Sequence, residues 1–215
     1  MLENQCTVLA IDDHPLFRKG LADLLAMEPN LSLVAEAADG LSGLRLAQQF
    51  QPDLIILDLN MKGMDGLETL KALKDADVDG RVIMMTVSDA EHDVVSALRA
   101  GADGYLLKDM EPEDTLRYLH QASQGRMVIS ERLTELLAHA LRTEQQTPEN
   151  IHAAGLTERE DQILTLIAEG LSNKLIARRL DISEGTVKVH VKHLLKKLNL
   201  HSRVEAAVWV VNNLK

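Results

Sequence analysis

Cysteine and aromatic residues are nearly absent from this chain. Its 215 residues include one cysteine, one tryptophan, two tyrosines and two phenylalanines. A single thiol, Cys6, cannot form an internal disulfide framework and fits a reducing cytoplasm. No apolar run approaches the roughly 20 residues that a bilayer-spanning helix needs, and the start MLENQ lacks the basic residues of a signal peptide. We therefore expect a cytoplasmic protein without membrane insertion, whose core consists of aliphatic residues and methionine.

Positive charge is also scarce, and it is unevenly distributed along the chain. The formal net charge is −10. The segment through Thr147 has 13 Lys and Arg against 25 Asp and Glu, a balance of −12, whereas the remainder has 10 against 8, a balance of +2. Residues Leu171–Arg203 alone have 8 basic and 2 acidic side chains, a balance of +6. An acidic part followed by a locally basic part predicts two domains, of which the second binds nucleic acid.

Short apolar runs alternate with amphipathic segments in the first half. The apolar runs are Val8–Ile11, Leu31–Glu36, Leu54–Leu57, Arg81–Met85 and Gly104–Leu107. Helical patterns follow them at Leu16–Met27, Leu41–Phe50, Leu67–Asp75, Glu91–Ala100 and from Pro112 to about Gly125. Strict strand–helix alternation predicts an α/β fold, a doubly wound parallel sheet of five strands with helices on both faces.

Polar residues follow four of these runs, at the point where each strand ends. Asp12 and Asp13 follow the first run, Asp58 the third, Thr86 the fourth and Lys108 the fifth. Parallel strands open to solvent at their carboxyl ends, where α/β folds place their chemistry. Three acids, a hydroxyl and a lysine on one rim can bind a divalent cation and accept a phosphoryl group.

The oxygen-rich rim favours magnesium over other cofactors. Mg²⁺ prefers octahedral oxygen ligation, typically from one or two carboxylates, waters and substrate oxygens. We predict Asp13 and Asp58 as direct ligands, Asp12 in an outer or water-mediated position, and the backbone carbonyl of Asn60 as a further ligand. The ammonium of Lys108 and the hydroxyl of Thr86 are then available to the phosphoryl group. His14, beside the acidic pair, is interpreted as a surface or capping residue.

The second half has helical sequence patterns, and capping and turn residues mark where the helices begin and end. Residues 1–128 are assigned to the first domain, 129–155 to a helix (Ser130–Arg142) and a polar linker (Thr143–Gly155), and 156–215 to a small all-α domain. Thr157 and Glu160 form a capping box that opens a helix. Asn173–Leu180, the turn Asp181–Ser183 and Glu184–Leu198 form a helix-turn-helix pattern.

One face of the Glu184–Leu198 segment is apolar and the opposite face is basic. The apolar face predicts packing on the domain core, and the basic face predicts contact with the major groove of double-stranded DNA. The residues assigned to DNA binding are Lys188, Val189, Lys192, Lys196, Lys197, Arg178 and Arg179.

Both halves resemble a known family. IDDHP, LIILDLNMKGMDGLETL, MTVSD and GADGYLLKDMEP resemble the flavodoxin-like receiver domain of two-component response regulators. Thr157–Lys215 resembles the LuxR/FixJ-type helix-turn-helix domain. The resemblance implies that a sensor histidine kinase phosphorylates Asp58. It also implies that Thr86, Tyr105 and Lys108 form a phosphoryl-sensing switch, and that Lys188, Val189 and Lys192 face base edges.

The segments VKVHVKHLLKKL and SRVEAAVWV are similar in amino-acid sequence to nitrate/nitrite response regulators. This similarity implies a non-enzymatic regulator of nitrate- and nitrite-responsive anaerobic respiration genes, which binds DNA as a homodimer and acts on RNA polymerase. The sequence departs from many receivers in having Lys62 and Asp109 where prolines are common.

Two other functions stay open at this point. A Mg²⁺-dependent phosphatase of the haloacid-dehalogenase type uses an Asp-x-Asp motif on its first strand, whereas Asp58 lies on the third predicted strand. A constitutive DNA-binding protein, with the acidic domain serving only dimerisation, would bind DNA independently of phosphorylation and of Mg²⁺.

Overall fold

The chain forms two compact units. The computed structural model describes residues 5–76, 78–130, 133, 155–200 and 202–213. The first unit consists of residues 1–124 with 128–130, and the second of residues 125–127 with 131–215. The helix predicted at Ser130–Arg142 and the linker predicted at Thr143–Gly155 lie almost entirely outside the described residues.

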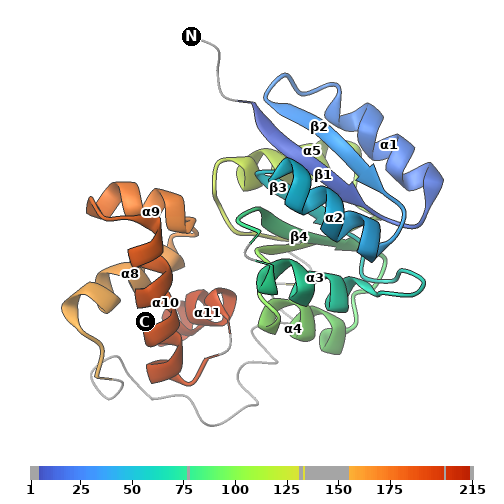
Figure 1. Ribbon diagram of the computed structural model, residues 1–215. Coiled ribbons are helices and arrows are strands. Elements are labelled where there is room, and N and C mark those ends of the chain that lie inside the picture. The colour runs from blue at the N-terminus through green and yellow to red at the C-terminus, as the bar shows by residue number, and fades with distance from the viewer. Residues whose placement is uncertain (1–4, 77, 131–132, 134–154, 201, 214–215) are drawn as a thin grey trace. The chain divides into compact units, whose positions relative to one another are not determined.

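The first unit contains a parallel sheet covered by helices on both faces (Figure 1). The strand order is β2-β1-β3-β4-β5-β6. The strands are β1 (Cys6–Ile11), β2 (Leu31–Ala37), β3 (Leu54–Leu57), β4 (Arg81–Thr86), β5 (Gly104–Leu107) and β6 (Val128–Ile129). The prediction of five strands was wrong by one. β6 has two residues and pairs with Gly104 and Tyr105 of β5, and so short a strand leaves no apolar run in the sequence.

The helices of this unit begin and end close to the predicted positions. They are α1 (Pro15–Leu25), α2 (Gly40–Phe50), α3 (Gly66–Asp75), α4 (Glu91–Arg99) and α5 (Pro112–Ser123). Helices α1 and α5 start with proline. Proline is tolerated there because backbone N–H groups in the first turn have no hydrogen-bond partner within the helix. The side chain of Asp65 accepts the N–H of Glu68 at 2.8 Å, and Glu68 reaches back in a capping box.

The strand order reverses between β1 and β3, and this reversal positions the site. Chain crossovers on the two sides of such a point lead to opposite faces, so the loops there separate and leave a crevice. Helices α1 and α5 lie side by side on one face, while α2, α3 and α4 lie together on the other (Figure 1). All four residues of β3 are buried, as a strand covered on both faces requires.

The second unit consists of four helices among its described residues. They are α8 (Glu158–Ala168), α9 (Asn173–Leu180), α10 (Glu184–Leu198) and α11 (Arg203–Asn213). Their core is aliphatic apart from Trp209, which is 5% exposed. The predicted capping box at Thr157 and Glu160 is confirmed. None of the helices in the described part of the chain has the length and apolar character to cross a bilayer.

Candidate functional site

The carboxyl ends of β1 and β3 bring the predicted acids together. The N–H of Asp58 donates to the carbonyl of Ile11 at 2.9 Å, which fixes the two strand ends side by side. Gly66 completes this arrangement, because a Cβ at this residue would lie 2.1 Å from the carbonyl oxygen of Asp58. Only glycine therefore lets the start of α3 approach Asp58, at the end of β3, so closely. The sequence shows this glycine but not the close approach that requires it.

Lys108 connects the two most buried carboxylates of the rim, Asp12 and Asp58. Its Nζ lies 2.6 Å from Oδ2 of Asp12 and 3.0 Å from Oδ2 of Asp58. Asp12 and Asp58 are 3% and 2% exposed, so little water screens these charges. The other oxygen of Asp12 accepts the N–H of His14 at 2.8 Å. Protein donors therefore contact both oxygens of Asp12, and its outer position around a cation stays a prediction.

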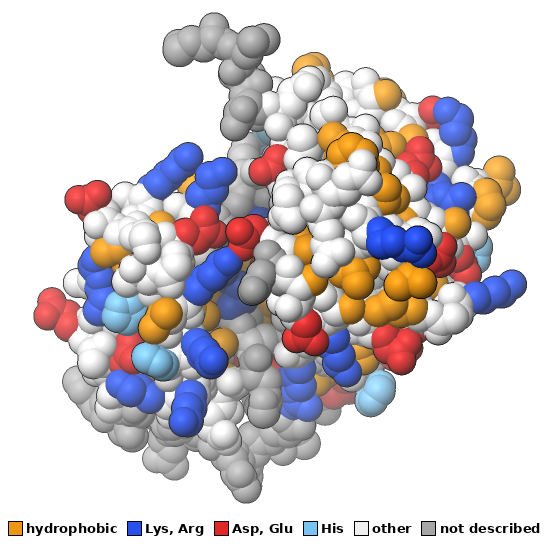
Figure 2. Space-filling view, in the orientation of Figure 1, with side chains coloured by type: hydrophobic (Ala, Val, Ile, Leu, Met, Phe, Trp, Pro, Cys, Tyr) orange, Lys and Arg blue, Asp and Glu red, His pale blue; other side chains and the backbone are white. Residues whose placement is uncertain are grey.

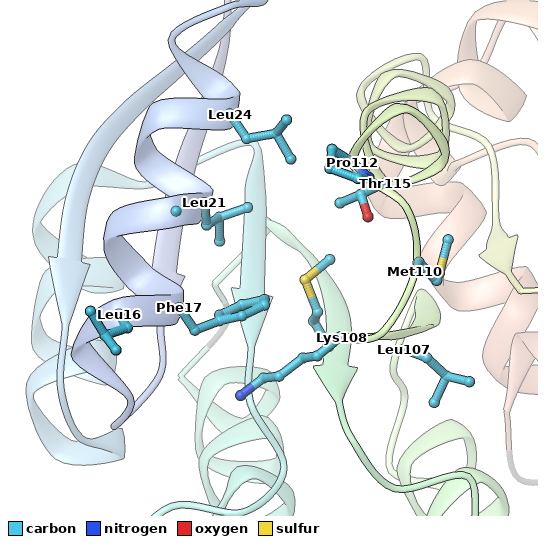
Figure 3. Close-up of a pocket in the computed structure, with 11 residues that line it drawn as sticks. Leu16, Phe17, Leu21, Leu24, Leu107, Lys108, Met110, Pro112 and Thr115 are labelled. Atoms are coloured by element: carbon cyan, nitrogen blue, oxygen red, sulfur yellow. The ribbon is translucent and has the colours of Figure 1, made fainter.

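The side chain of Lys108 lines a largely apolar pocket. Its Nζ lies 4.6 Å from the centre of the Phe17 ring, at cation–π distance. Figure 3 shows Phe17 of α1 facing the lysine across a pocket of about 280 Å³. The opposite wall comes from the segment that joins β5 to α5, which includes Met110, and from the start of α5 at Pro112. This packing directs the ammonium towards the acids.

Two carboxylate oxygens remain open. Within the described residues, buried Oδ1 of Asp13 and Oδ2 of Asp58 accept no hydrogen bond. Oδ2 of Asp58 nevertheless forms an ion pair with the ammonium of Lys108, which lies 3.0 Å away. Oδ2 of Asp13 accepts the N–H of Lys62 at 3.3 Å, a bond that the proline common at this position in receivers could not donate.

The open oxygens fit a divalent cation. Asp12, Asp13, His14 and Asp58 each offer one ligand atom, and these atoms lie within 4.8 Å of one another. Buried oxygens without donors and several negative charges are the conditions that a hard cation satisfies. Asn60 is exposed at the same edge, where its side-chain amide donates to the hydroxyl of Thr86 at 3.4 Å.

Burial and neighbouring charges act on Asp58 in opposite directions. Burial raises its pKa above the ordinary value, and the charge of Asp12 adds to this effect. The ammonium of Lys108 and the N–H of Asn60 lower the pKa without cancelling the increase. A cation at the open oxygens would favour the ionised form, which is the nucleophilic one.

Thr86 and Tyr105 meet in the loop that follows β4. The hydroxyl of Thr86 is fully buried and accepts the N–H of Ser88 at 3.3 Å. The hydroxyl of Tyr105 donates to the carbonyl of Ser88 at 3.1 Å. Tyr105 has no exposed surface, and burial raises its pKa. Two of the three predicted switch residues, Thr86 and Tyr105, therefore contact the same loop residue.

The helix-turn-helix elements have the predicted bounds. Asp181 ends α9 in the left-handed conformation, with φ of 53°. Ser183 then accepts the N–H of Thr186 at 3.0 Å and opens α10. Val187, Leu194 and Leu198 of α10 are buried, so the opposite face of α10 is available to a partner.

The predicted DNA-binding residues lie on the surface of the second unit. Figure 2 shows Lys and Arg side chains gathered there. The exposed members are Lys188, Val189, Lys192, Lys196, Lys197, Arg178 and Arg179. Val189 is 53% exposed, so its apolar side chain is accessible to a partner between the neighbouring lysines Lys188 and Lys192.

Lys197 differs from the others because its ammonium ties α10 to α8. Its Nζ lies 2.7 Å from Glu160, whose side chain also accepts the N–H of Thr157 at 2.8 Å. Burial opposes ionisation of Glu160, yet the bonds from Lys197 and Thr157 hold its pKa below the ordinary value. Lys197 therefore helps to orient the helix that presents the other cations.

Comparison with known families agrees with this geometry. The model described as response regulator receiver domain matches residues 8–120, and the model described as bacterial regulatory proteins, luxR family, matches residues 154–210. The chain belongs to the luxR-family response regulators. The receiver match covers the acidic rim, and the luxR match covers α8, α9 and α10 in full.

This response regulator has relatives that match nearly its whole length. It is 58% identical to the nitrate/nitrite response regulator protein NarL of Escherichia coli K12 over 97% of this chain and 96% of that protein. It is 49% identical to NarP of the same strain over 94% and 92% of the two chains. The crystal structure of ChrA, from a heme-sensing two-component system, is 32% identical, with a TM-score of 0.53 over 97% and 98%.

Proposed function

We propose that this response regulator controls nitrate- and nitrite-responsive genes of anaerobic respiration through phosphorylation of Asp58 by a sensor histidine kinase. The observation that carries the proposal is the state of Asp58 itself. It is buried, and its Oδ2, which accepts no hydrogen bond within the described residues, lies 3.0 Å from the ammonium of Lys108. The assignment to nitrate and nitrite rests on the identity with NarL and NarP.

Asp13, Asp58 and the carbonyl of Asn60 would hold Mg²⁺, with Asp12 in the outer position. Bound there, the cation offsets the negative charge of the acids and of the incoming phosphate. The ionised oxygen of Asp58 attacks phosphorus, and the phosphate bond to the kinase histidine breaks. Lys108 then pairs with the new phosphoryl oxygens, because its ammonium already lies 3.0 Å from the acceptor carboxylate.

The phosphoryl group would act on the rest of the unit through Thr86. The hydroxyl of Thr86 accepts from Ser88 and Asn60 in this structure. Rotation towards the phosphoryl oxygens would release Ser88, to which Tyr105 donates. We infer that the loop after β4 rearranges and that Tyr105 repacks with it, which changes the surface of α4 and β5.

The second unit supplies the output. Lys188, Val189 and Lys192 are proposed to face base edges, while Lys196, Arg178 and Arg179 contact phosphates. Lys197 adds positive charge near the same backbone while holding Glu160. We propose that the phosphorylated form binds two half-sites as a homodimer and contacts RNA polymerase, all in the cytoplasm. The covalent phosphate would then be a stored signal and not an intermediate of enzymatic turnover.

Phosphorylation of the full chain tests the acceptor assignment. Wild type incubated with a small-molecule phosphodonor and Mg²⁺ should gain one phosphoryl group, measured by intact-mass spectrometry. Asp58→Asn should gain none, and the exposed control Asp75→Asn at the end of α3 should behave as wild type. Labelling of Asp58→Asn at the wild-type level would contradict the assignment.

A further inference from the structure

His14 does not cap the helix that it precedes. It occupies the position before α1, but within the described residues its side chain makes no capping hydrogen bond. Instead, Nδ1 of His14 lies 2.9 Å from Oδ1 of Asp13, 3.4 Å from Oδ1 of Asp12 and 3.9 Å from Oδ2 of Asp58. The ring therefore belongs to the acidic cluster.

The contact of His14 with Asp13 is close but is not a hydrogen bond. Oδ1 of Asp13 is buried and accepts no hydrogen bond from the described residues, although Nδ1 lies 2.9 Å away. A protonated ring held only by charge would be expected to direct its N–H at that oxygen. An imidazole nitrogen and a carboxylate oxygen at this separation, with no hydrogen bond between them, are arranged like neighbouring ligands of one cation.

The distances agree with a coordination sphere. Transition-metal bonds to imidazole nitrogen and carboxylate oxygen are about 2.1 Å long, so adjacent octahedral ligands lie about 3.0 Å apart and opposite ones about 4.2 Å. The distances from Nδ1 to the three carboxylates span 2.9 to 3.9 Å, so the shortest is close to the adjacent separation and the longest is below the opposite one.

Lys108 and His14 approach different oxygens of Asp12, since Lys108 contacts Oδ2 and His14 lies nearer to Oδ1. At Asp58 they approach the same oxygen, Oδ2, at 3.0 Å and 3.9 Å. Oδ1 of Asp13 lies next to His14 at 2.9 Å. The side chain of His14 is 67% exposed, so the ring closes only part of the site and leaves other positions to water and phosphate oxygens.

We propose that Nδ1 of His14 is a direct ligand of the cation bound by Asp13 and Asp58, so that the site prefers first-row transition metals to Mg²⁺. Imidazole nitrogen suits these metals, whereas Mg²⁺ takes oxygen ligands and exchanges them reluctantly for nitrogen. This inference rests on the cation site of the proposed function. It adds that the identity of the bound cation depends on the concentrations of transition-metal ions as well as on that of Mg²⁺.

Pulsed electron paramagnetic resonance of Mn²⁺ bound to the full chain tests the ligand directly. Wild type should show coupling to a directly bound ¹⁴N nucleus, and His14→Gln should lose it. The control is His92→Gln, because His92 is exposed on α4 and lies 3.6 Å from Asp93, away from the cluster. The control should keep the coupling.

Calorimetric titrations with Co²⁺ and Mg²⁺ test the preference. In His14→Gln the Co²⁺ affinity should fall at least tenfold, while the Mg²⁺ affinity changes less than about twofold. Mn²⁺ binding to wild type without ¹⁴N coupling, or equal losses for Co²⁺ and Mg²⁺ in His14→Gln, would overturn the role of His14 and leave the oxygen site intact. Cation affinities unaffected by Asp13→Asn would overturn the site itself.

Discussion

Replacing Lys108 with methionine tests how the receiver tolerates its buried acids. Methionine keeps an apolar stem against Phe17 and the pocket around it but removes the charge. The ammonium lies 2.6 Å from Asp12 and 3.0 Å from Asp58, so each attraction is about 6 kcal/mol at an effective dielectric constant of about 20. Burial of the lysine offsets most of this, and removing one partner of such a cluster costs about 3–5 kcal/mol net.

Urea unfolding in EDTA should show this loss in the first unit alone. With a slope of about 2 kcal/mol per molar urea, the far-UV circular dichroism midpoint of the receiver should fall by about 2 M. The fluorescence of Trp209, which is 5% exposed in the second unit, should keep its midpoint. Lys71→Met, at an exposed residue of α3, should change the receiver by less than about 0.5 kcal/mol.

Mg²⁺ should narrow the difference between Lys108→Met and wild type. The cation replaces the missing positive charge, and at a hundred times its dissociation constant it stabilises the folded state by about 2.7 kcal/mol. It binds the variant more tightly because Lys108 no longer repels it. Equal stabilities of the two proteins in EDTA, or a difference that Mg²⁺ leaves unchanged, would refute the argument that Lys108 balances the acids.

Three further perturbations test the switch, the second unit and the DNA contacts. Tyr105→Phe removes the hydrogen bond to Ser88 at a cost of about 0.5–1.5 kcal/mol, so amide hydrogen exchange in the loop after β4 should accelerate about threefold to tenfold. An unchanged exchange rate would show that this hydrogen bond does not stabilise the loop. The pKa of Glu160 is lowered in the folded state. Ionised Glu160 therefore stabilises the fold at pH values above its ordinary pKa of 4.5, and this contribution is lost as the pH falls through the pKa of the folded state. The stability advantage of wild type over Glu160→Gln, followed by tryptophan fluorescence, should therefore shrink below pH 4.5, and an advantage independent of pH would contradict it. Lys196→Ala should reduce the slope of log DNA affinity against log salt concentration by about 1. An unaltered slope would show that Lys196 does not contact a DNA phosphate.

Helix boundaries in the second unit were predictable because side chains mark them. The bounds of α9 and α10 agree with the prediction, since Ser172 and Ser183 cap them and accept N–H groups three residues on. Such caps act locally and can be found without knowing the fold. The two-residue strand β6 was missed because its formation depends on pairing with β5 and not on its own residues.

At the rim, the sequence predicted which residues gather but not how each one is used. Strand ends placed Asp12, Asp58 and Lys108 together, because parallel strands open at one edge. His14 was assigned to the surface, and its exposure agrees, but the direction of its ring towards the acids follows from packing. In the sequence, Lys197 is one of several lysines of α10. Only the structure shows that its ammonium forms an ion pair with Glu160 of α8.

DNA binding by the full chain with and without beryllofluoride, a phosphoryl mimic, tests the central claim most directly. Sites selected from a random DNA pool by wild type would be titrated at one stated salt concentration with wild type and with Asp58→Asn. The account predicts that the mimic raises the affinity of wild type at least tenfold and leaves Asp58→Asn unchanged. An equal response in both proteins, or none in wild type, would contradict control of DNA binding through Asp58.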